Sequence, residues 1–304
     1  MHSVGVVLHP ERDSAEAVTA ILDWAKERSI KVFGIVSELS RLNCEAIGVT
    51  PEELGRRSDL IVSLGGDGTM LRAMRLADRQ RASVLGVNLG KLGFLAEIDV
   101  PELPGALSAV DAREYMIESR LAVDAALGDE VMTAFNDIAV VRQPGMSSAR
   151  VAVRVDDQPF VSYAADALVV ATPTGSTAYS FSAGGPIVSP SVESLLVTPA
   201  SPHSAYNRGL VLSVNDTLAL DILPGSEQLA VEVDGQVAVY VSAGDSLDLR
   251  PRPGAARVVR LGRTTFYERA RRKLRLTDSA EIPATFGDPG DLRDRPGGPA
   301  EDVR

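Results

Sequence analysis

The spacing of apolar positions divides the chain into two parts with different rhythms. Apolar runs typical of buried strands occur early in the chain, at residues 4–8, 31–36, 60–64 and 83–88. Amphipathic patterns predict helices at residues 15–28 and from about 69 to 79. Strands that alternate with helices indicate parallel βαβ units, so we expect a Rossmann-like α/β domain over residues 1–113.

After a short helix expected at about residues 101–113, the pattern changes to closely spaced strands. Short β-type runs occur at residues 119–126, 131–142, 150–155, 167–171, 210–213, 217–222, 229–233, 237–242 and 246–250. No long helical pattern separates them, which predicts a β-sandwich domain over residues 114–255. Residues 256–277 are a C-terminal segment with a helix at 265–275, and the Pro- and Gly-rich residues 278–304 are expected to be a disordered tail.

Composition and charge narrow the class of protein. With 304 residues, of which 45% are hydrophobic, the chain can fill a core for each of two domains. The net charge of −10 argues against nucleic-acid and membrane-surface partners. A single cysteine, Cys44, and the lack of a signal-peptide pattern or membrane-spanning run indicate a cytoplasmic protein. The three histidines lack metal-ligand spacing, so no metal site made by side chains is predicted.

The most informative stretch is G-G-D-G-T, formed by Gly65, Gly66, Asp67, Gly68 and Thr69. A glycine turn between a strand and a helix lets backbone N–H groups approach a phosphate, and the helix N-terminus adds partial positive charge. A carboxylate at such a turn would repel phosphate unless it binds metal or accepts a proton from an attacking hydroxyl. The turn therefore indicates a kinase with Asp67 as its base; a helix cap made by Asp67 or Thr69 is the plainer alternative.

Two further stretches carry polar residues next to apolar runs. Asn136 and Asp137 interrupt one strand-like run, and such a pair could read a base edge or ribose hydroxyls. An Asx turn is the alternative there. In residues 166–186 a buried run ends in hydroxyl residues and glycines, which would suit a ribose or adenine, with Tyr179 as a base stack. A turn that satisfies its own backbone is the alternative for this stretch.

Taken together, these motifs resemble those of the NAD kinase family. Their order between about residues 60 and 236 is G-G-D-G-T, N-L-G-x-L-G-F-L, N-[DE], T-P-T-G-S-T-A-Y-S, P-H-S and D-G-Q. The first motif is shared with lipid kinases and phosphofructokinases, whereas the T-P-T-G-S-T-A-Y-S run is far more specific. The resemblance implies transfer of the γ-phosphoryl of ATP, or of polyphosphate, to the 2′-hydroxyl of the adenosine ribose of NAD. It further implies a divalent cation, usually Mg²⁺, carried with ATP, and assembly into homodimers or homotetramers.

The resemblance also implies roles for individual residues. Asp67 is similar in position to the proton acceptor of the family, and Gly68 and Arg72 to its neighbours around the phosphates. Residues that match NAD contacts are Asn136, Asp137, Arg150, Asp166, Thr177, Ala178, Tyr179, Ser180, Phe181, Ser182 and Gln236. The irregular loop before Arg150 leaves that assignment open by one residue. The helix with Phe266 and Tyr267 resembles a closing segment that returns to the first domain.

Other functions account for parts of the sequence. A lipid or sugar kinase would share the glycine turn but leaves residues 174–182 unexplained, and a basic amphipathic surface for lipid is missing. A catalytically silent regulator that binds NAD(H) would need the same motifs. A nucleic-acid-binding module would use the basic residues of the last helix, although such a run is usually a solvated face. These residues are Arg269, Arg271, Arg272, Lys273 and Arg275.

Overall fold

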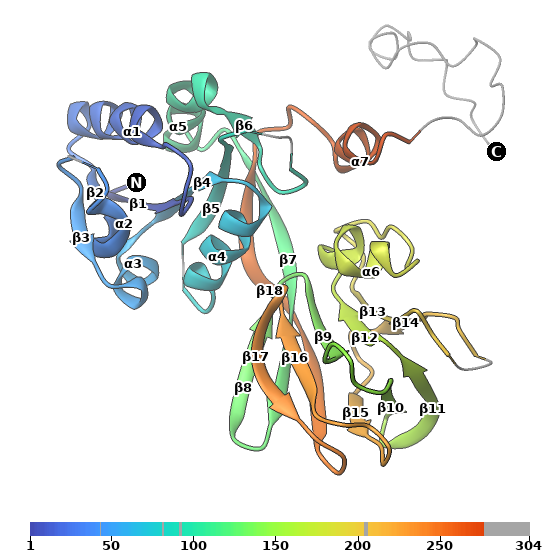
Figure 1. The fold of residues 1–304 in the computed structure, drawn as a ribbon. Coiled ribbons are helices and arrows are strands. Elements are labelled where there is room, and N and C mark those ends of the chain that lie inside the picture. Colours follow the sequence, from blue (N-terminus) through green and yellow to red (C-terminus); the bar gives the residue numbers. More distant parts are fainter. Residues whose placement is uncertain (43, 81, 91–92, 204–205, 277–304) are drawn as a thin grey trace, which may run out of the picture.

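The computed structural model describes residues 1–276 except 43, 81, 91–92 and 204–205. The tail expected at residues 278–304 lies outside the described residues. Figure 1 shows an α/β domain beside a sandwich of two sheets, and the fold class predicted from the sequence is confirmed.

The first part of the chain forms an α/β domain on a parallel sheet. Its strand order is β5-β4-β1-β2-β3. The strands are β1 (Ser3–Leu8), β2 (Lys31–Ile35), β3 (Ile47–Val49), β4 (Leu60–Gly65) and β5 (Ser83–Asn88). The helices are α1 (Ala15–Glu27), α2 (Val36–Leu39), α3 (Pro51–Arg57), α4 (Asp67–Ala77) and α5 (Leu103–Asp111), with β6 (Ile98–Asp99) and a 3₁₀ turn (Val100–Glu102) between β5 and α5.

Both faces of this parallel sheet are buried. Val4 and Val6 of β1 share a core with α1 and α5, whereas Val7 points to the other face and packs with α3 and α4. Helices on both sides explain why the strands are continuous apolar runs. The carboxyl ends of β4 and β5 therefore carry their loops to one edge of the sheet, where ligands bind in open α/β folds.

The second part of the chain is a β-sandwich. One sheet has the order β14-β13-β12-β9-β16-β17. Its strands are β9 (Asp137–Arg142), β12 (Ala167–Ala171), β13 (Ser194–Ala200), β14 (Leu210–Ser213), β16 (Leu229–Val233) and β17 (Gln236–Val241). The facing layer contains β7 (Met116–Leu127), β8 (Glu130–Ala134), β10 (Ala149–Val155), β11 (Gln158–Ala165), β15 (Leu218–Ile222) and β18 (Ser246–Arg260). Buried residues of both layers, among them Val140, Val170, Val151 and Leu220, form the shared core.

The two parts are joined by a continuous sheet. The long strand β18 lies in the sandwich at its start and pairs with β5 near its end, where Val258 is opposite Val84. One layer of the sandwich thus continues into the sheet of the α/β domain as a 12-stranded sheet. The predicted boundary at residues 255 and 256 falls inside this strand. The chain then enters α7 (Phe266–Leu274), while the short helix α6 (Tyr179–Ser182) follows β12 in the sandwich (Figure 1).

Some elements differ from the sequence prediction. The run 131–142 is not one strand but two, β8 and β9, which belong to different sheets. The chain leaves β8 at residues 135–136, where the carboxylate of Asp234 accepts hydrogen bonds from the backbone N–H groups. Helix α4 begins at Asp67, ahead of the predicted start near 69, and strands β3, β11 and β13 were missed. Pro199 inside β13 makes that run atypical of a strand.

Candidate active site

The glycine turn joins β4 to α4 as predicted. Gly66 is the N-cap residue of α4, and no side chain makes a cap hydrogen bond there, so Asp67 and Thr69 are not helix caps. A Cβ at Gly65 would overlap the side chain of Thr69, whereas a Cβ at Gly66 or Gly68 would have no atom of the described residues within 4 Å. The backbone at Gly66 and Gly68 is therefore accessible to a ligand at the positive end of the helix.

A cavity of about 280 Å³ lies at this turn and draws residues from both domains. Its lining is His9, Pro10, Gly66, Gly68, Thr69, Arg72, Arg75 and Gln236. The predicted phosphate turn, Arg72 and Gln236 therefore come together in space. Arg72 donates to the carbonyl of Leu8 at 2.6 Å and pairs with Glu38 at 2.7 Å, while its buried Nε has no partner within the described chain.

The carboxylate of Asp67 does not line this cavity but meets the segment after β5. Its Oδ2 accepts the backbone N–H of Phe94 at 3.1 Å, and its Oδ1 that of Leu95 at 3.0 Å. A Cβ at Gly93 would overlap Oδ1, which explains the second glycine of the N-L-G-x-L-G-F-L motif. Oδ2 also pairs with Nζ of Lys273 from α7 at 2.7 Å. The sequence did not single out Lys273 for this site.

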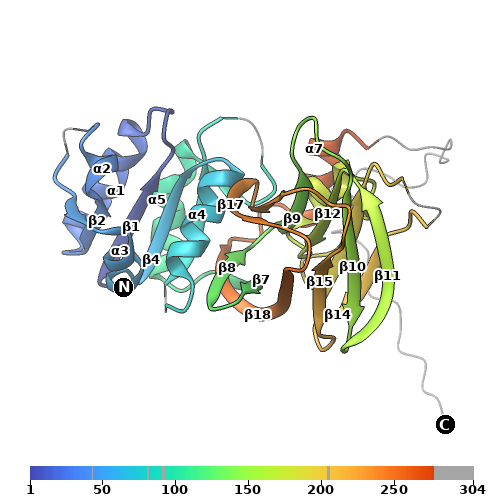
Figure 2. The same ribbon diagram turned by 60° about the horizontal axis from the view of Figure 1, so that its bottom comes forward.

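A second residue to which the sequence analysis gave no role is Asp234, the first residue of the D-G-Q motif, in the turn between β16 and β17. Its side chain is 2% exposed, and its Oδ1 accepts the backbone N–H of Asn136 at 2.7 Å and of Phe135 at 3.1 Å. Its Oδ2 lies 2.5 Å from Nη1 of Arg75 on α4. Figures 1 and 2 both place this turn against α4. Asp234 thus links the predicted Asn136–Asp137 pair to the helix that begins with Asp67.

The hydroxyl-rich turn after β12 contacts the Asn136 backbone. The N–H of Thr172 donates to the carbonyl of Asn136 at 2.8 Å, and a Cβ at Gly175 would overlap that carbonyl. The two stretches singled out separately in the sequence therefore form one site. This contact explains the glycine of the T-P-T-G-S run.

Not all hydroxyls of this turn face outward. Ser176 donates to the carbonyl of Pro173 at 2.7 Å, and Ser180 is bonded to Thr198 at 3.0 Å. Both serines are fully buried, so they hold the turn together, as the alternative interpretation has it. Residues left partly or well exposed for a ligand are Thr177, Ala178, Tyr179, Phe181 and Ser182.

The arginine next to Asp166 is Arg142. Nε of Arg142 lies 2.5 Å from Oδ1 of Asp166, and this hydrogen bond holds the pKa of Asp166 below its usual value. Nε2 of His203, from the P-H-S motif, lies 3.6 Å from the same oxygen. The guanidinium of Arg150 instead lies against Gly225, and its backbone N–H donates to Ser226. The structure thus places Arg142, and not Arg150, beside Asp166.

Asp137 lies in an environment that strongly alters its titration. Burial, followed by the negative charges of Asp234 and Glu232, raises its pKa to about 7, and the backbone N–H of Tyr179 opposes this only in part. A carboxyl that stays protonated to near neutral pH is a hydrogen-bond donor as well as an acceptor.

Asp137→Asn is expected to change how stability depends on pH. The unfolded chain loses the Asp137 proton at the ordinary pKa of an aspartate, about 4, and the folded chain loses it near 7. This group therefore lowers wild-type stability as pH rises through that interval. The asparagine does not titrate, so the variant should gain stability relative to wild type between about pH 5 and pH 8. Urea unfolding of both proteins at the two pH values measures this difference. If the difference in stability between the variant and the wild type were the same at pH 5 and at pH 8, a raised pKa of Asp137 would be contradicted.

Two other kinds of site are absent from the part of the chain that the structure describes. No group of three or more His, Cys, Asp or Glu side chains is placed to hold a metal ion there. No helix within the same ranges is long and apolar enough to cross a membrane.

An α/β domain whose glycine–aspartate turn shares a cavity with a β-sandwich is the architecture of a two-domain phosphotransferase. Two family models match the chain, the ATP-NAD kinase N-terminal domain over residues 4–115 and the ATP-NAD kinase C-terminal domain over residues 135–261. The NAD kinase of Heliobacterium modesticaldum is 40% identical over 280 residues, which cover 90% of this chain and 99% of that protein. The chain therefore belongs to the NAD kinase family.

Solved structures agree with this assignment. The yeast NADH kinase, complexed with NADH, has a TM-score of 0.79 and 25% identity, and the match covers 93% of this chain and 90% of that one. An NAD kinase from Archaeoglobus fulgidus in complex with ATP has a TM-score of 0.70 and 26% identity, with 90% and 98% covered. Both relatives are kinases that bind a nucleotide on this fold.

Proposed function

We propose that the chain transfers the γ-phosphoryl of ATP to the 2′-hydroxyl of the adenosine ribose of NAD, forming NADP. The observation that carries this proposal is the fixed carboxylate of Asp67 at the N-terminus of α4, beside glycines whose backbone opens into a cavity. The bound NADH and ATP of the two solved relatives support the two substrates.

In the proposed reaction, Asp67 is the proton acceptor. The 2′-hydroxyl oxygen forms a bond to the γ-phosphorus, the bond from that phosphorus to the β–γ bridging oxygen breaks, and the hydroxyl proton moves to Asp67. From the described residues, Oδ2 accepts two hydrogen bonds and Oδ1 accepts one. Because each carboxylate oxygen can accept two, we assign the proton of the 2′-hydroxyl to Oδ1.

The remaining site residues would bind and orient the substrates. The backbone at Gly66 and Gly68, with the N-terminus of α4, would hold phosphates in the cavity. Asn136, Asp137 and the exposed part of the 177–182 turn would hold the nucleosides of NAD. Within the described ranges no group of three or more metal-ligating side chains occurs, so we propose that Mg²⁺ enters as the Mg²⁺ complex of ATP, or of polyphosphate.

We extend the proposal to location and assembly. A single cysteine suits a cytoplasmic enzyme. The outer strands of the six-stranded sheet expose Val211, Val237 and Tyr240, which supports a homodimer or homotetramer. Sedimentation of the purified protein measures this state.

A coupled assay tests the reaction. Protein, NAD⁺, ATP and Mg²⁺ are mixed, and NADP⁺ is detected with a dehydrogenase specific for it. We expect a signal that disappears when ATP is left out, and a parallel reaction with polyphosphate tests the second donor. Binding of NAD⁺ without turnover on either donor would contradict the proposal and favour a silent regulator.

A further inference from the structure

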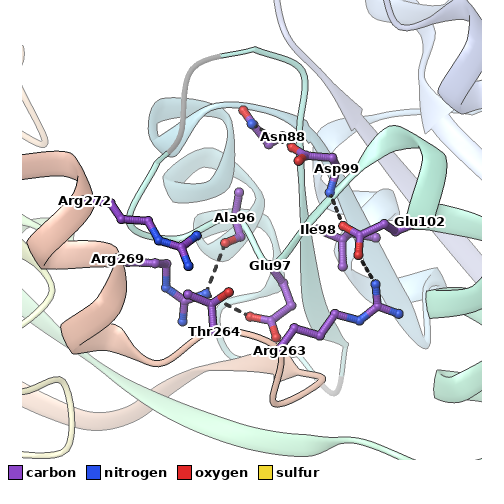
Figure 3. A pocket seen from close by; sticks show the side chains of 10 residues that line it. All are labelled: Asn88, Ala96, Glu97, Ile98, Asp99, Glu102, Arg263, Thr264, Arg269 and Arg272. Carbon is purple, nitrogen blue, oxygen red and sulfur yellow. Dashed lines mark hydrogen bonds and ion pairs between the residues drawn. The ribbon is translucent and has the colours of Figure 1, made fainter. Parts of the chain in front are cut away.

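The C-terminal helix α7 is anchored to the α/β domain by a buried ion pair. Arg269 is 3% exposed, and its Nη1 lies 3.1 Å from Glu97, which also pairs with Arg260 at 3.0 Å. Figure 3 shows Arg269 reaching Glu97 and the carbonyl of Ala96 at a cavity of about 140 Å³ beside the helix. Thr265 and Glu268 form a capping box that fixes the start of the helix.

This anchor sets the position of the residue one turn further on. Lys273 follows Arg269 by four residues and so lies on the same face of α7. Its Nζ is 2.7 Å from Oδ2 of Asp67 and 4.6 Å from the centre of the Phe94 ring. The ring of Phe94 also lies 6.5 Å from the ring of Phe266, at the start of α7. The ammonium of Lys273 thus contacts the carboxylate of Asp67 and the ring of Phe94.

The same anchor supports the segment that donates to Asp67. Arg260 donates to the carbonyl of Leu95 at 3.0 Å, while the N–H of Leu95 donates to Oδ1 of Asp67. Glu97 therefore ties together α7, the end of β18 and the 93–95 segment. Two of the basic residues on this helix form ion pairs within the protein, Arg269 with Glu97 and Lys273 with Asp67. These two residues therefore do not belong to a solvated, charged helix face.

We propose that Lys273 is a positioning residue for Asp67, which it aligns and keeps charge-balanced for proton transfer. The proposal rests on the role of Asp67 as the proton acceptor. In the resting site the ammonium faces the carboxylate. When Asp67 takes the 2′-hydroxyl proton it becomes neutral, and the ammonium then offsets the negative charge of the phosphoryl group that has moved to the ribose. No proton leaves Lys273 in this step.

The first test is Lys273→Met, which removes the charge but keeps most of the side-chain length. We expect kcat to fall about 10- to 100-fold, as for a misaligned catalytic group, while KM for NAD and ATP changes less than about threefold. Lys273→Arg should recover part of the loss. Arg272→Met is the matched control, because this exposed neighbour carries the same charge and lies at the cavity of Figure 3, not at Asp67. It should stay within about twofold of wild type.

A double-variant cycle with Asp67→Asn separates the two assignments. If Lys273 acts through Asp67, Lys273→Met should cost little in the Asp67→Asn background, measured as NADP formed over long incubations. The same fold-loss in both backgrounds would overturn the positioning role, as would a rise in kcat, which would make Lys273 an inhibitory contact. The single Asp67→Asn variant tests the role of Asp67 separately. Full turnover of this variant would contradict the assignment of Asp67 as the proton acceptor.

Discussion

Asp67→Asn is expected to lower turnover by about 10²–10⁴-fold while NAD binding stays measurable. The side chain keeps its size, but the amide cannot accept the proton of the 2′-hydroxyl. Both oxygens of Asp67 accept backbone N–H groups. In either orientation of the asparagine amide, its NH₂ group would therefore face one of these N–H donors and lose that hydrogen bond. The coupled assay measures turnover, and calorimetry with NAD⁺ measures binding.

Asp129→Asn is the control for this variant. It makes the same change of charge at an exposed position in the turn between β7 and β8. Turnover of Asp67→Asn within threefold of wild type would contradict the base assignment. A loss of NAD binding equal to the loss of turnover would instead make Asp67 a residue that holds the substrate.

The sequence located parts of the candidate site but few of the contacts within it. The glycine turn was recognised because its pattern of strand, glycines and helix is local, whereas Gln236 was singled out only through the resemblance to a family; both line the same cavity. Lys273 was seen only as one member of a basic helix, since its partner Asp67 lies 206 residues earlier in the chain. A helical charge pattern does not tell which face meets another element.

Packing also decided between interpretations that the sequence left open. Ser176 and Ser180 belong to the same hydroxyl run as Thr177 and Ser182, but only the latter two remain available to a ligand. Similarly, Asn136 and Asp137 marked an interruption of the run 131–142, but nothing local showed that its two halves belong to opposite layers of the sandwich. The cause is a carboxylate about a hundred residues away, Asp234, whose role depends on the fold being complete.

Asp234→Ala is expected to lower the free energy of unfolding by about 3 kcal/mol, because each buried donor left without its acceptor costs about 1–3 kcal/mol. The carboxylate serves four donors: the backbone N–H groups of residues 135–137 and the guanidinium of Arg75. Alanine leaves all four without this acceptor in a place where the aspartate side chain is 2% exposed. Urea unfolding measures the loss.

Asp245→Ala is the matched control, because this exposed aspartate also accepts a backbone N–H, that of Ser242 at 2.7 Å, in the turn before β18. Its loss should cost about 1 kcal/mol or less. Equal costs at both positions would show that Asp234 acts only as a turn residue.

Where alanine prevents folding, Asp234→Asn keeps one acceptor oxygen and removes the charge. In that variant the pKa of Asp137 should fall, because the negative charge of Asp234 helps to raise it. The pH range over which stability falls would then lie lower than in the wild type, because the carboxylate of Asp234 also acts on the protonation of Asp137.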